Sequence, residues 1–310
     1  MRLFGWFRRA SHHQAAPAPT DQRWSWFAGR RILSFGSYIF PKDVAEGNRL
    51  DLQHHLIKLS LGGNYRAPVR QPRKILDVAC GTGIWCREMA SEFPEAQVIG
   101  FDVDSTPMEA SRARLGPNGQ FPANFRFLEA NALQPFPFED HAFDLTHARL
   151  ISPFVPVAFW PRVVAEMVRV TRPGGYVEIM ESELPTSSSP AFNAMLDVTS
   201  QLLTKNGLYV GAAPHVQGHL TQAGLERVQQ RRIVLGTGRF GHRQQRLLLA
   251  DFVAGAENMR PIAVKSGLIS DAQYGALYEQ EKREMPQTTL VWPFICTFGM
   301  KPLVRSSVSS

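Results

Sequence analysis

Beyond residue 72 the chain alternates short apolar runs with stretches whose apolar residues recur every three to four positions. This alternation predicts parallel strands joined by helices through right-handed crossovers. The expected strands are residues 74–79, 97–102, 124–129, 142–147, 175–181, 227–235 and 293–300. The expected helices are residues 82–93, 106–115, 157–171, 242–259 and 270–285. The pattern predicts an α/β fold with a doubly wound, seven-stranded, mostly parallel sheet.

The same pattern suggests a division of the chain. Residues 1–22 read as a disordered basic tail, and residues 23–70 as an N-terminal helical lid whose main helix covers 44–61. Residues 71–302 form the expected catalytic domain, followed by a short tail over 303–310. Within that domain, residues 239–290 form a helical insertion before the last strand. We expect this insertion to act as a substrate cover.

The net charge of +7 has little effect on the predicted function, because it is concentrated at the ends of the chain. Residues 1–31 hold six Arg and one Asp, and residues 301–310 add one Lys and one Arg. The intervening body is neutral. A nucleic-acid substrate is therefore disfavoured, since phosphate binding needs an excess of basic side chains.

The remaining composition indicates a cytoplasmic protein. Three cysteines suit a reducing compartment and provide no metal-ligand spacing, so no metal is expected. No apolar run approaches the roughly 20 residues of a membrane-spanning helix. The Arg-rich tail has aromatic residues near its start, so at most we expect it to make weak contact with a membrane surface.

The strongest chemical signal is the end of the first strand, where residues 75–83 read Ile-Leu-Asp-Val-Ala-Cys-Gly-Thr-Gly. Gly81 and Gly83 permit a tight turn and close approach of a ligand to the start of the next helix. A doubly wound sheet binds its ligand at the carboxyl ends of its strands. Asp102 ends the second strand and can accept hydrogen bonds from both hydroxyls of an adenosine ribose.

Two cofactor classes fit this arrangement, a dinucleotide and S-adenosylmethionine. The dinucleotide fingerprint needs a small third residue, whereas Cys86 stands there after the bulky Trp85. Asp77 in the strand would repel a pyrophosphate but suits a ligand that carries an ammonium and a sulfonium group. S-adenosylmethionine is therefore preferred, and a nucleotide-dependent oxidoreductase remains an alternative.

These motifs resemble the class I S-adenosylmethionine-dependent methyltransferases, which have a Rossmann-like fold, over roughly residues 73–302. The resemblance implies that Asp77, Gly81 and Gly83 hold the methionine part of the cofactor and that Asp102 binds the ribose. It further implies adenine contacts from the residues after the second and third strands, namely Val103, Asn131 and Ala132. The expected product is S-adenosylhomocysteine.

A narrower resemblance lies upstream, where residues 38–55 and the turn Gly-Thr-Gly-Ile-Trp are similar to fungal secondary-metabolism methyltransferases, a group that includes a regulator working with velvet proteins. It implies a lid over the cofactor, with Tyr38 as a cofactor contact and Arg49 and His54 nearby. A regulatory or scaffold protein acting through protein partners is therefore a second hypothesis.

Candidate catalytic groups follow the fourth and fifth strands. A base is needed when the methyl acceptor is a hydroxyl or a protonated amine. His147, which also lies at the cofactor rim, is the first candidate and Glu181 is the second. We expect methylation of an O, N or C atom of a small, apolar or aromatic metabolite.

Overall fold

The computed structural model describes residues 24–27, 30–33, 44–115, 120–238 and 241–303. The first predicted tail, Tyr38 and nearly all of the second predicted tail lie outside the described residues. Within the described part of the chain, no helix is both long enough and apolar enough to cross a membrane.

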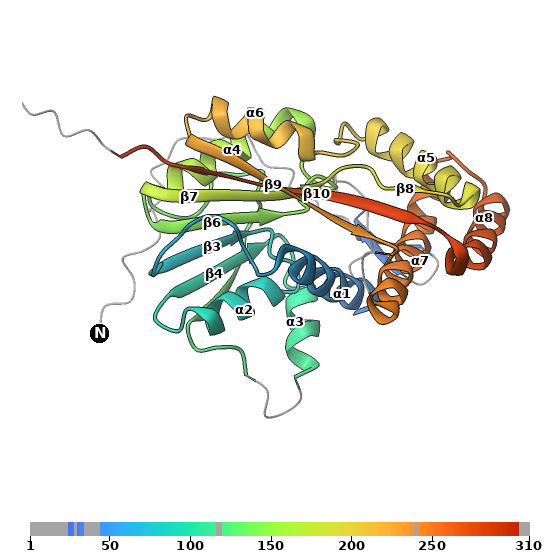
Figure 1. Cartoon of the computed structure of the whole chain (residues 1–310), viewed down its shortest axis with the longest axis horizontal. Helices are drawn as coiled ribbons and strands as arrows, with labels where there is room; N and C mark the ends of the chain where they lie inside the picture. Colours follow the sequence, from blue (N-terminus) through green and yellow to red (C-terminus); the bar gives the residue numbers. More distant parts are fainter. Residues whose placement is uncertain (1–23, 28–29, 34–43, 116–119, 239–240, 304–310) are drawn as a thin grey trace, which may run out of the picture.

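The main sheet confirms the predicted α/β fold and its mostly parallel order (Figure 1). The five parallel strands are β5 (Phe125–Glu129), β4 (Gln97–Asp102), β3 (Lys74–Val78), β6 (Phe143–Arg149) and β7 (Thr171–Ser182), in that spatial order. The antiparallel strand β10 (Leu290–Met300) pairs with β7, and β9 (Glu226–Gly236) pairs with the far side of β10. The carboxyl ends of β3, β4 and β6 therefore meet at one edge.

The predicted number of seven strands was wrong by one. The additional strand, β8 (Thr186–Ser187), pairs with Leu290 and Val291 of β10 on the side where β7 pairs further along the strand. The chain leaves the ladder after Ser182, and Pro185, which lacks a backbone N–H, precedes its return. Two polar residues give no apolar run, so periodicity does not reveal this strand.

Helices cover both faces of the sheet. On one face lie α2 (Ile84–Glu92) and α3 (Thr106–Ala113), and on the other lie α4 (Trp160–Val170) and α6 (Ala213–Gln222) (Figure 1). A short turn of 3-10 helix, Val157–Phe159, leads into α4.

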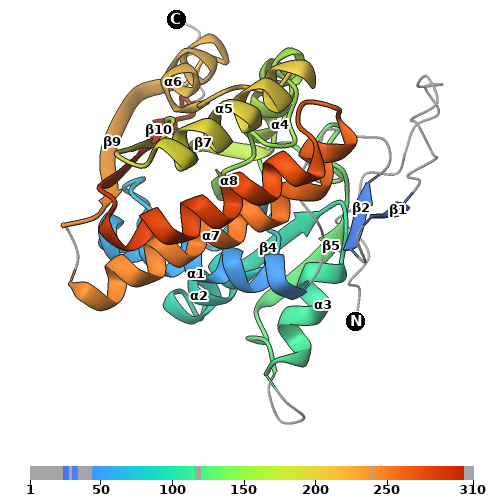
Figure 2. The same cartoon turned by 90° about the vertical axis from the view of Figure 1, so that its right-hand side faces the viewer.

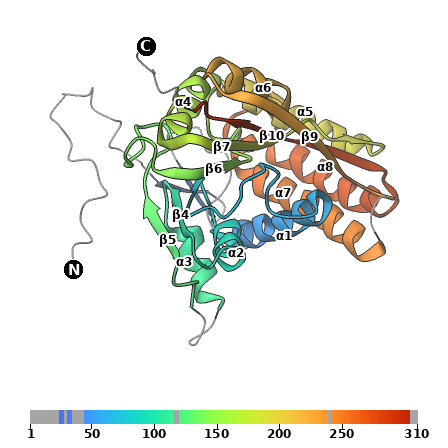
Figure 3. The ribbon, with the colours of Figure 1, turned by 60° about the vertical axis from the view of Figure 1, so that its left-hand side comes forward.

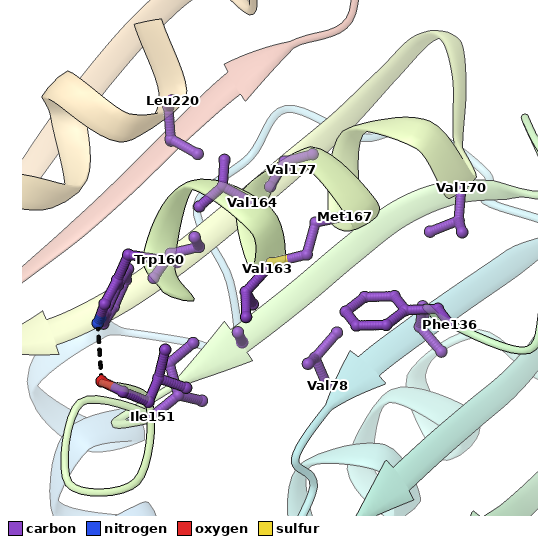
Figure 4. Close-up of a cluster of buried hydrophobic side chains, with 14 of the residues drawn as sticks. Val78, Phe136, Ile151, Trp160, Val163, Val164, Met167, Val170, Val177 and Leu220 are labelled. Carbon is purple, nitrogen blue, oxygen red and sulfur yellow. Dashed lines mark hydrogen bonds between the residues drawn. The ribbon is translucent and has the colours of Figure 1, made fainter. Parts of the chain in front are cut away.

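Helix α4 illustrates why its sequence is helical. Its buried residues recur every three or four positions, so one stripe faces the sheet. Figure 4 shows Val163, Val164 and Met167 from this stripe in one cluster with Val78 of β3 and Val177 of β7. Burial of these apolar side chains fixes the two strands beneath the helix.

The N-terminal segment is only partly helical. The predicted helix is confirmed with the same bounds as α1 (Val44–Leu61), but residues before it form an antiparallel pair, β1 (Trp24–Phe27) and β2 (Arg30–Leu33). Helix α1 packs against α7, as Figure 3 shows.

The predicted insertion is present as α7 (His242–Lys265) and α8 (Asp271–Glu284), followed by a 3-10 turn at Met285–Gln287. Helix α7 runs beyond its expected end and contains Pro261. Helix α5 (Pro190–Lys205), which was not predicted, lies beside α7 and α8 (Figure 2). Helix α6 was also not predicted. The division of the chain into tail, lid, catalytic domain and cover remains a proposal.

Candidate active site

A cavity of about 320 Å³ lies between the sheet edge and the helices. Its floor is formed at the ends of the parallel strands by Asp102 and by most of the residues between 77 and 85 and between 147 and 154, with Val78, Gly83, Ala148 and Ile151 outside the lining. Its cover is formed by side chains of α5, α7 and α8 and by Trp292 of β10. One continuous space therefore joins the predicted cofactor edge to the predicted substrate cover.

The glycine turn at the floor depends on left-handed backbone. Gly81 has φ 56° and Gly83 has φ 69°, values that L residues rarely adopt. The two positions differ in packing. A Cβ atom added to Gly83 would collide with Met108, whereas a Cβ atom added to Gly81 would have no atom within 4 Å. Ala79, which is not a glycine, also has a positive φ of 58°. Such strain is typical of a ligand-binding turn.

Asp102 is connected to this turn. It lines the cavity at the end of β4, and its Oδ2 accepts a hydrogen bond from the backbone N–H of Gly81 at 3.0 Å. This hydrogen bond thus fixes the glycine turn after β3 and the Asp102 carboxylate, the predicted ribose-binding group, relative to one another.

His147 and Asp77 form a buried pair on neighbouring strands. They stand opposite each other in the β3–β6 register, and His147 Nδ1 lies 2.7 Å from Asp77 Oδ1. Since a carboxylate only accepts, we assign the proton to Nδ1, which leaves Nε2 as the basic ring nitrogen. The Trp85 ring stacks on the imidazole at 3.9 Å between centroids and 3° between planes. Both members of the pair line the cavity.

A second chain of polar contacts ties α1 to the floor. Arg149, which lines the cavity, donates to His54 Nδ1 at 2.9 Å, and His54 Nε2 lies 3.0 Å from Glu88. Arginine can only donate, so the His54 proton sits on Nε2. Burial lowers the pKa of His54 to about 4, although the hydrogen bond to Glu88 opposes this shift. The neutral imidazole is a fixed link between helix and strand.

This link also bears on metal binding. His54, His55 and Glu88 bring ligand atoms within 4.8 Å of one another. However, both ring nitrogens of His54 are engaged, and the Lys58 ammonium donates to Glu88 at 2.7 Å. The geometry therefore favours a structural contact over a metal centre.

Arg49 joins α1 to α7 above the cavity. Its guanidinium lies 2.6 Å from Glu46 and 3.1 Å from Asp251. Asn258 of α7 donates to Glu46, so the two helices share one buried polar cluster. Burial raises the pKa of Asp251, although Arg49 opposes that effect.

Glu181 lies apart from the cavity. Its fully buried carboxyl accepts from the backbone N–H groups of Ile151 and Ser152 at 2.6 and 3.1 Å, and from the Ser152 hydroxyl at 2.8 Å. Burial raises its pKa to about 7, against the effect of these hydrogen bonds. This position favours holding the backbone after β6 over direct contact with a substrate.

The predicted adenine contacts lie at the correct strand ends but outside the cavity lining. Val103 follows β4, and Asn131 and Ala132 follow β5. The Asn131 side-chain oxygen accepts from the backbone N–H of Leu133 at 2.9 Å. In this structure Asn131 therefore supports its own turn.

Sequence reasoning predicted the two helices of the insertion but missed helix α5 and the acids of the cover. Helix α5 contributes apolar side chains to the cavity, and α7 and α8 add the acids Asp251 and Glu281. The helix start did carry a signal, since Ser189 caps α5 by accepting from the N–H of Phe192 at 2.9 Å and Pro190 follows it. The buried acids had no comparable signal, because their surroundings come from other elements.

Comparison with known proteins adds a family relationship. Residues 75–175 match the family described as a methyltransferase domain. Over 228 residues the chain is 30% identical to methyltransferase pytC of Aspergillus terreus, which covers 70% of this chain and 67% of that protein.

Two further relatives match over shorter segments. Methyltransferase str3 of Strobilurus tenacellus is 36% identical over 45% of this chain and 46% of its own length. The secondary metabolism regulator LAE1 of Cochliobolus heterostrophus is 31% identical over 51% of this chain and 49% of its own length. The chain thus spans about half the length of these two relatives.

Proposed function

The chain belongs to the S-adenosylmethionine-dependent methyltransferases, and on that premise we propose that it methylates an O, N or C atom of a small, mainly apolar metabolite. The observation that carries this proposal is the single cavity, in which the glycine turn and Asp102 face an apolar cover. S-adenosylmethionine supplies an activated methyl group when bound. S-adenosylhomocysteine is the product.

In this proposal, different residues of the floor bind different parts of the cofactor. Asp102 binds the ribose hydroxyls, and the left-handed turn at Gly81, which has no side chain, lets the methionine part approach the backbone closely. Val103, Asn131 and Ala132 remain the proposed adenine contacts. Asp77 contributes negative charge near the sulfonium, but its oxygens already contact His147 and Cys86, so it acts partly through His147.

The cover provides the acceptor site. Its lining is dominated by apolar side chains, namely Phe192, Met195, Leu196, Leu203, Phe252 and Met259. A cavity of about 320 Å³ suits a small molecule that occupies it together with a cofactor. This supports a metabolite rather than a macromolecule as the methyl acceptor.

We propose that His147 is the base. A bond from the acceptor atom to the methyl carbon forms as the carbon–sulfur bond breaks, and the acceptor proton passes to Nε2 of His147. Asp77 then stabilises the imidazolium through its contact with Nδ1. Because the displacement is direct, alignment and exclusion of water by the cover supply much of the lowering of the barrier.

The first experiment measures cofactor binding and transfer. Calorimetry with S-adenosylhomocysteine should show binding at one site, and labelled S-adenosylmethionine should pass its methyl group to phenols or amines from a panel of aromatic metabolites. Absence of binding of either cofactor form would refute the proposed function.

His147→Ala tests the base directly. Turnover of an identified acceptor should fall by about 100-fold or more, because general base catalysis contributes factors of this size. Affinity for S-adenosylhomocysteine should stay within about twofold, since binding does not need the proton transfer. The exposed His55 provides the control, and His55→Ala should leave turnover unchanged. Unchanged turnover in His147→Ala would remove it as the base.

The similarity to the LAE1 regulator supports a second candidate, a methyltransferase-fold protein that acts through protein partners. The two functions differ in their dependence on Asp102. A scaffold should form its complex equally well with Asp102→Ala, whereas an enzyme should lose methyl transfer.

For location we propose the cytoplasm, because the three cysteines are free thiols and suit a reducing compartment.

A further inference from the structure

Glu281 is a buried carboxyl without a partner in the wall of the cavity. It belongs to α8, is 1% exposed and lines the cavity. Its Oε2 has no hydrogen-bond partner among the described residues. An unpaired buried carboxylate is unfavourable, since it loses hydration without replacing it.

The other carboxylates of the lining differ in this respect. Asp77 contacts His147, and Glu46 and Asp251 share Arg49. Glu183 pairs with Arg232, and Asp102 accepts from Gly81. Among the described residues of the lining, Glu281 is therefore the carboxylate left for a ligand.

The surroundings of Glu281 provide no substitute partner. Tyr274, seven positions earlier on the same face of α8, donates its hydroxyl to the backbone oxygen of Ala256 at 2.6 Å. Burial, followed by the like charge of Glu284 on the same helix, raises the pKa of Glu281 to about 7. A cationic ligand would therefore offset the unfavourable burial of an ionised Glu281.

A second polar atom in the same lining is also unpaired. The indole N–H of Trp292 is buried and has no partner among the described residues. It can only donate, whereas an ionised Glu281 can only accept. The cover thus carries one unpaired donor and one unpaired acceptor among the described residues of a mainly apolar wall.

The charge of the lining selects the kind of ligand. Six acids (Glu46, Asp77, Asp102, Glu183, Asp251, Glu281) stand against two guanidinium groups (Arg49, Arg149). An anionic acceptor would meet net repulsion, whereas a cation would gain a charge-assisted hydrogen bond.

We infer that Glu281 is the specificity residue of the acceptor site and binds a protonated nitrogen of an apolar amine. The Trp292 N–H donates to an oxygen or other acceptor atom of the same molecule. The inference rests on the proposed function, because it assigns the cover to the methyl acceptor. It concerns recognition, and His147 at the floor remains the group that takes the proton.

The test compares amines with alcohols of the same shape. Benzylamine, phenethylamine and tryptamine are titrated into the full chain saturated with S-adenosylhomocysteine at mildly alkaline pH, alongside benzyl alcohol, phenethyl alcohol and tryptophol. In the wild type at least one amine should bind about tenfold or more tightly than its alcohol, as expected for a hydrogen bond to a charged group. Glu281→Gln should abolish this preference.

Glu279→Gln is the matched control. Glu279 lies on the same helix with its side chain 57% exposed, so the same loss of charge occurs in solvent. This variant should keep the preference for amines. Glu281→Gln keeps the side-chain shape and removes a buried charge, and thermal melting checks that it is folded.

Two results would overturn the inference. One is that no amine in the panel binds wild type more tightly than its alcohol. The other is that Glu281→Gln retains the preference. Binding of S-adenosylhomocysteine in the same samples separates these outcomes from failure of the proposed function, which would appear as loss of cofactor binding in the wild type.

Discussion

The floor and the cover of the cavity differ in how completely their buried charges are paired. In the floor, Asp77 contacts His147, and Arg149 is connected through His54 to Glu88. In the cover, the Glu281 carboxyl has no partner among the described residues. The floor is thus largely complete within the protein, whereas the cover has polar atoms that lack a partner among the described residues and that a ligand can satisfy.

This contrast indicates where specificity lies. A cofactor shared by many enzymes can be bound by a preformed, internally connected floor. An acceptor that differs between enzymes is selected by the cover, which is made from helices inserted before the last strand. We therefore expect floor variants to change cofactor affinity and cover variants to change acceptor choice.

Asp102→Ala should give the largest effect. Loss of a charged acceptor for two ribose hydroxyls should weaken binding of S-adenosylhomocysteine by about 100-fold or more. Met195→Ala in the cover should change that affinity by less than about threefold, because no charged contact is lost. Calorimetry on both variants measures the difference. Equal losses would contradict the separation of floor and cover.

Gly83→Ala should destabilise the fold by about 3 kcal/mol, since it combines left-handed strain with overpacking against Met108. Gly81→Ala meets only the strain and should cost about 1 kcal/mol. Urea denaturation gives both free energies of unfolding. A similar cost at the two positions would show that close packing at Gly83 is unimportant.

The pH dependence of stability should have opposite signs in the two regions. Burial raises the pKa of Glu281 to about 7, so the unfolded chain ionises this carboxyl at a lower pH than the folded protein does, and the folded state loses stability as the pH rises from about 4.5 to about 7. Glu281→Gln should therefore gain stability relative to wild type by roughly 2–3 kcal/mol on going from about pH 5 to about pH 8.

Glu88 behaves in the opposite sense. Burial would raise its pKa, but hydrogen bonds from His54 and Lys58 outweigh burial and lower it to about 2. Its stabilising effect is present above about pH 4.5 and disappears as the pH falls toward 2. Glu88→Gln should thus be destabilised at neutral pH and approach wild type in acid. Denaturant melts across this range check both variants, and parallel profiles would contradict the contrast.

Much of the floor was predictable because its signals are local. A strand followed within a few residues by Gly-Thr-Gly specifies a tight turn, and an acid at the end of the next strand lies beside it in a parallel sheet. Gly81 and Asp102 are 21 positions apart and form a hydrogen bond. His147 was selected for a place after the fourth strand; it lies instead within β6 and lines the cavity, while its role as base stays a prediction.

The polar partners were not predictable in the same way. Asp77 was assigned to the cofactor, yet its nearest contact is His147, 70 positions away. Arg49 and Asp251 are 202 positions apart, and nothing near either residue in the sequence indicates the other. Glu181 had the correct position for a rim acid, but its side chain turns to the backbone after β6.

By itself the sequence determined the alternation of strands and helices, the left-handed glycine turn and the acid at the end of β4. Each of these depends on backbone preferences and periodicity within a few residues. The tertiary structure decided which buried charges are paired and that the Glu281 carboxyl is not. The reason is physical, because the energy of a buried charge depends on the dielectric and on partners brought from distant parts of the chain.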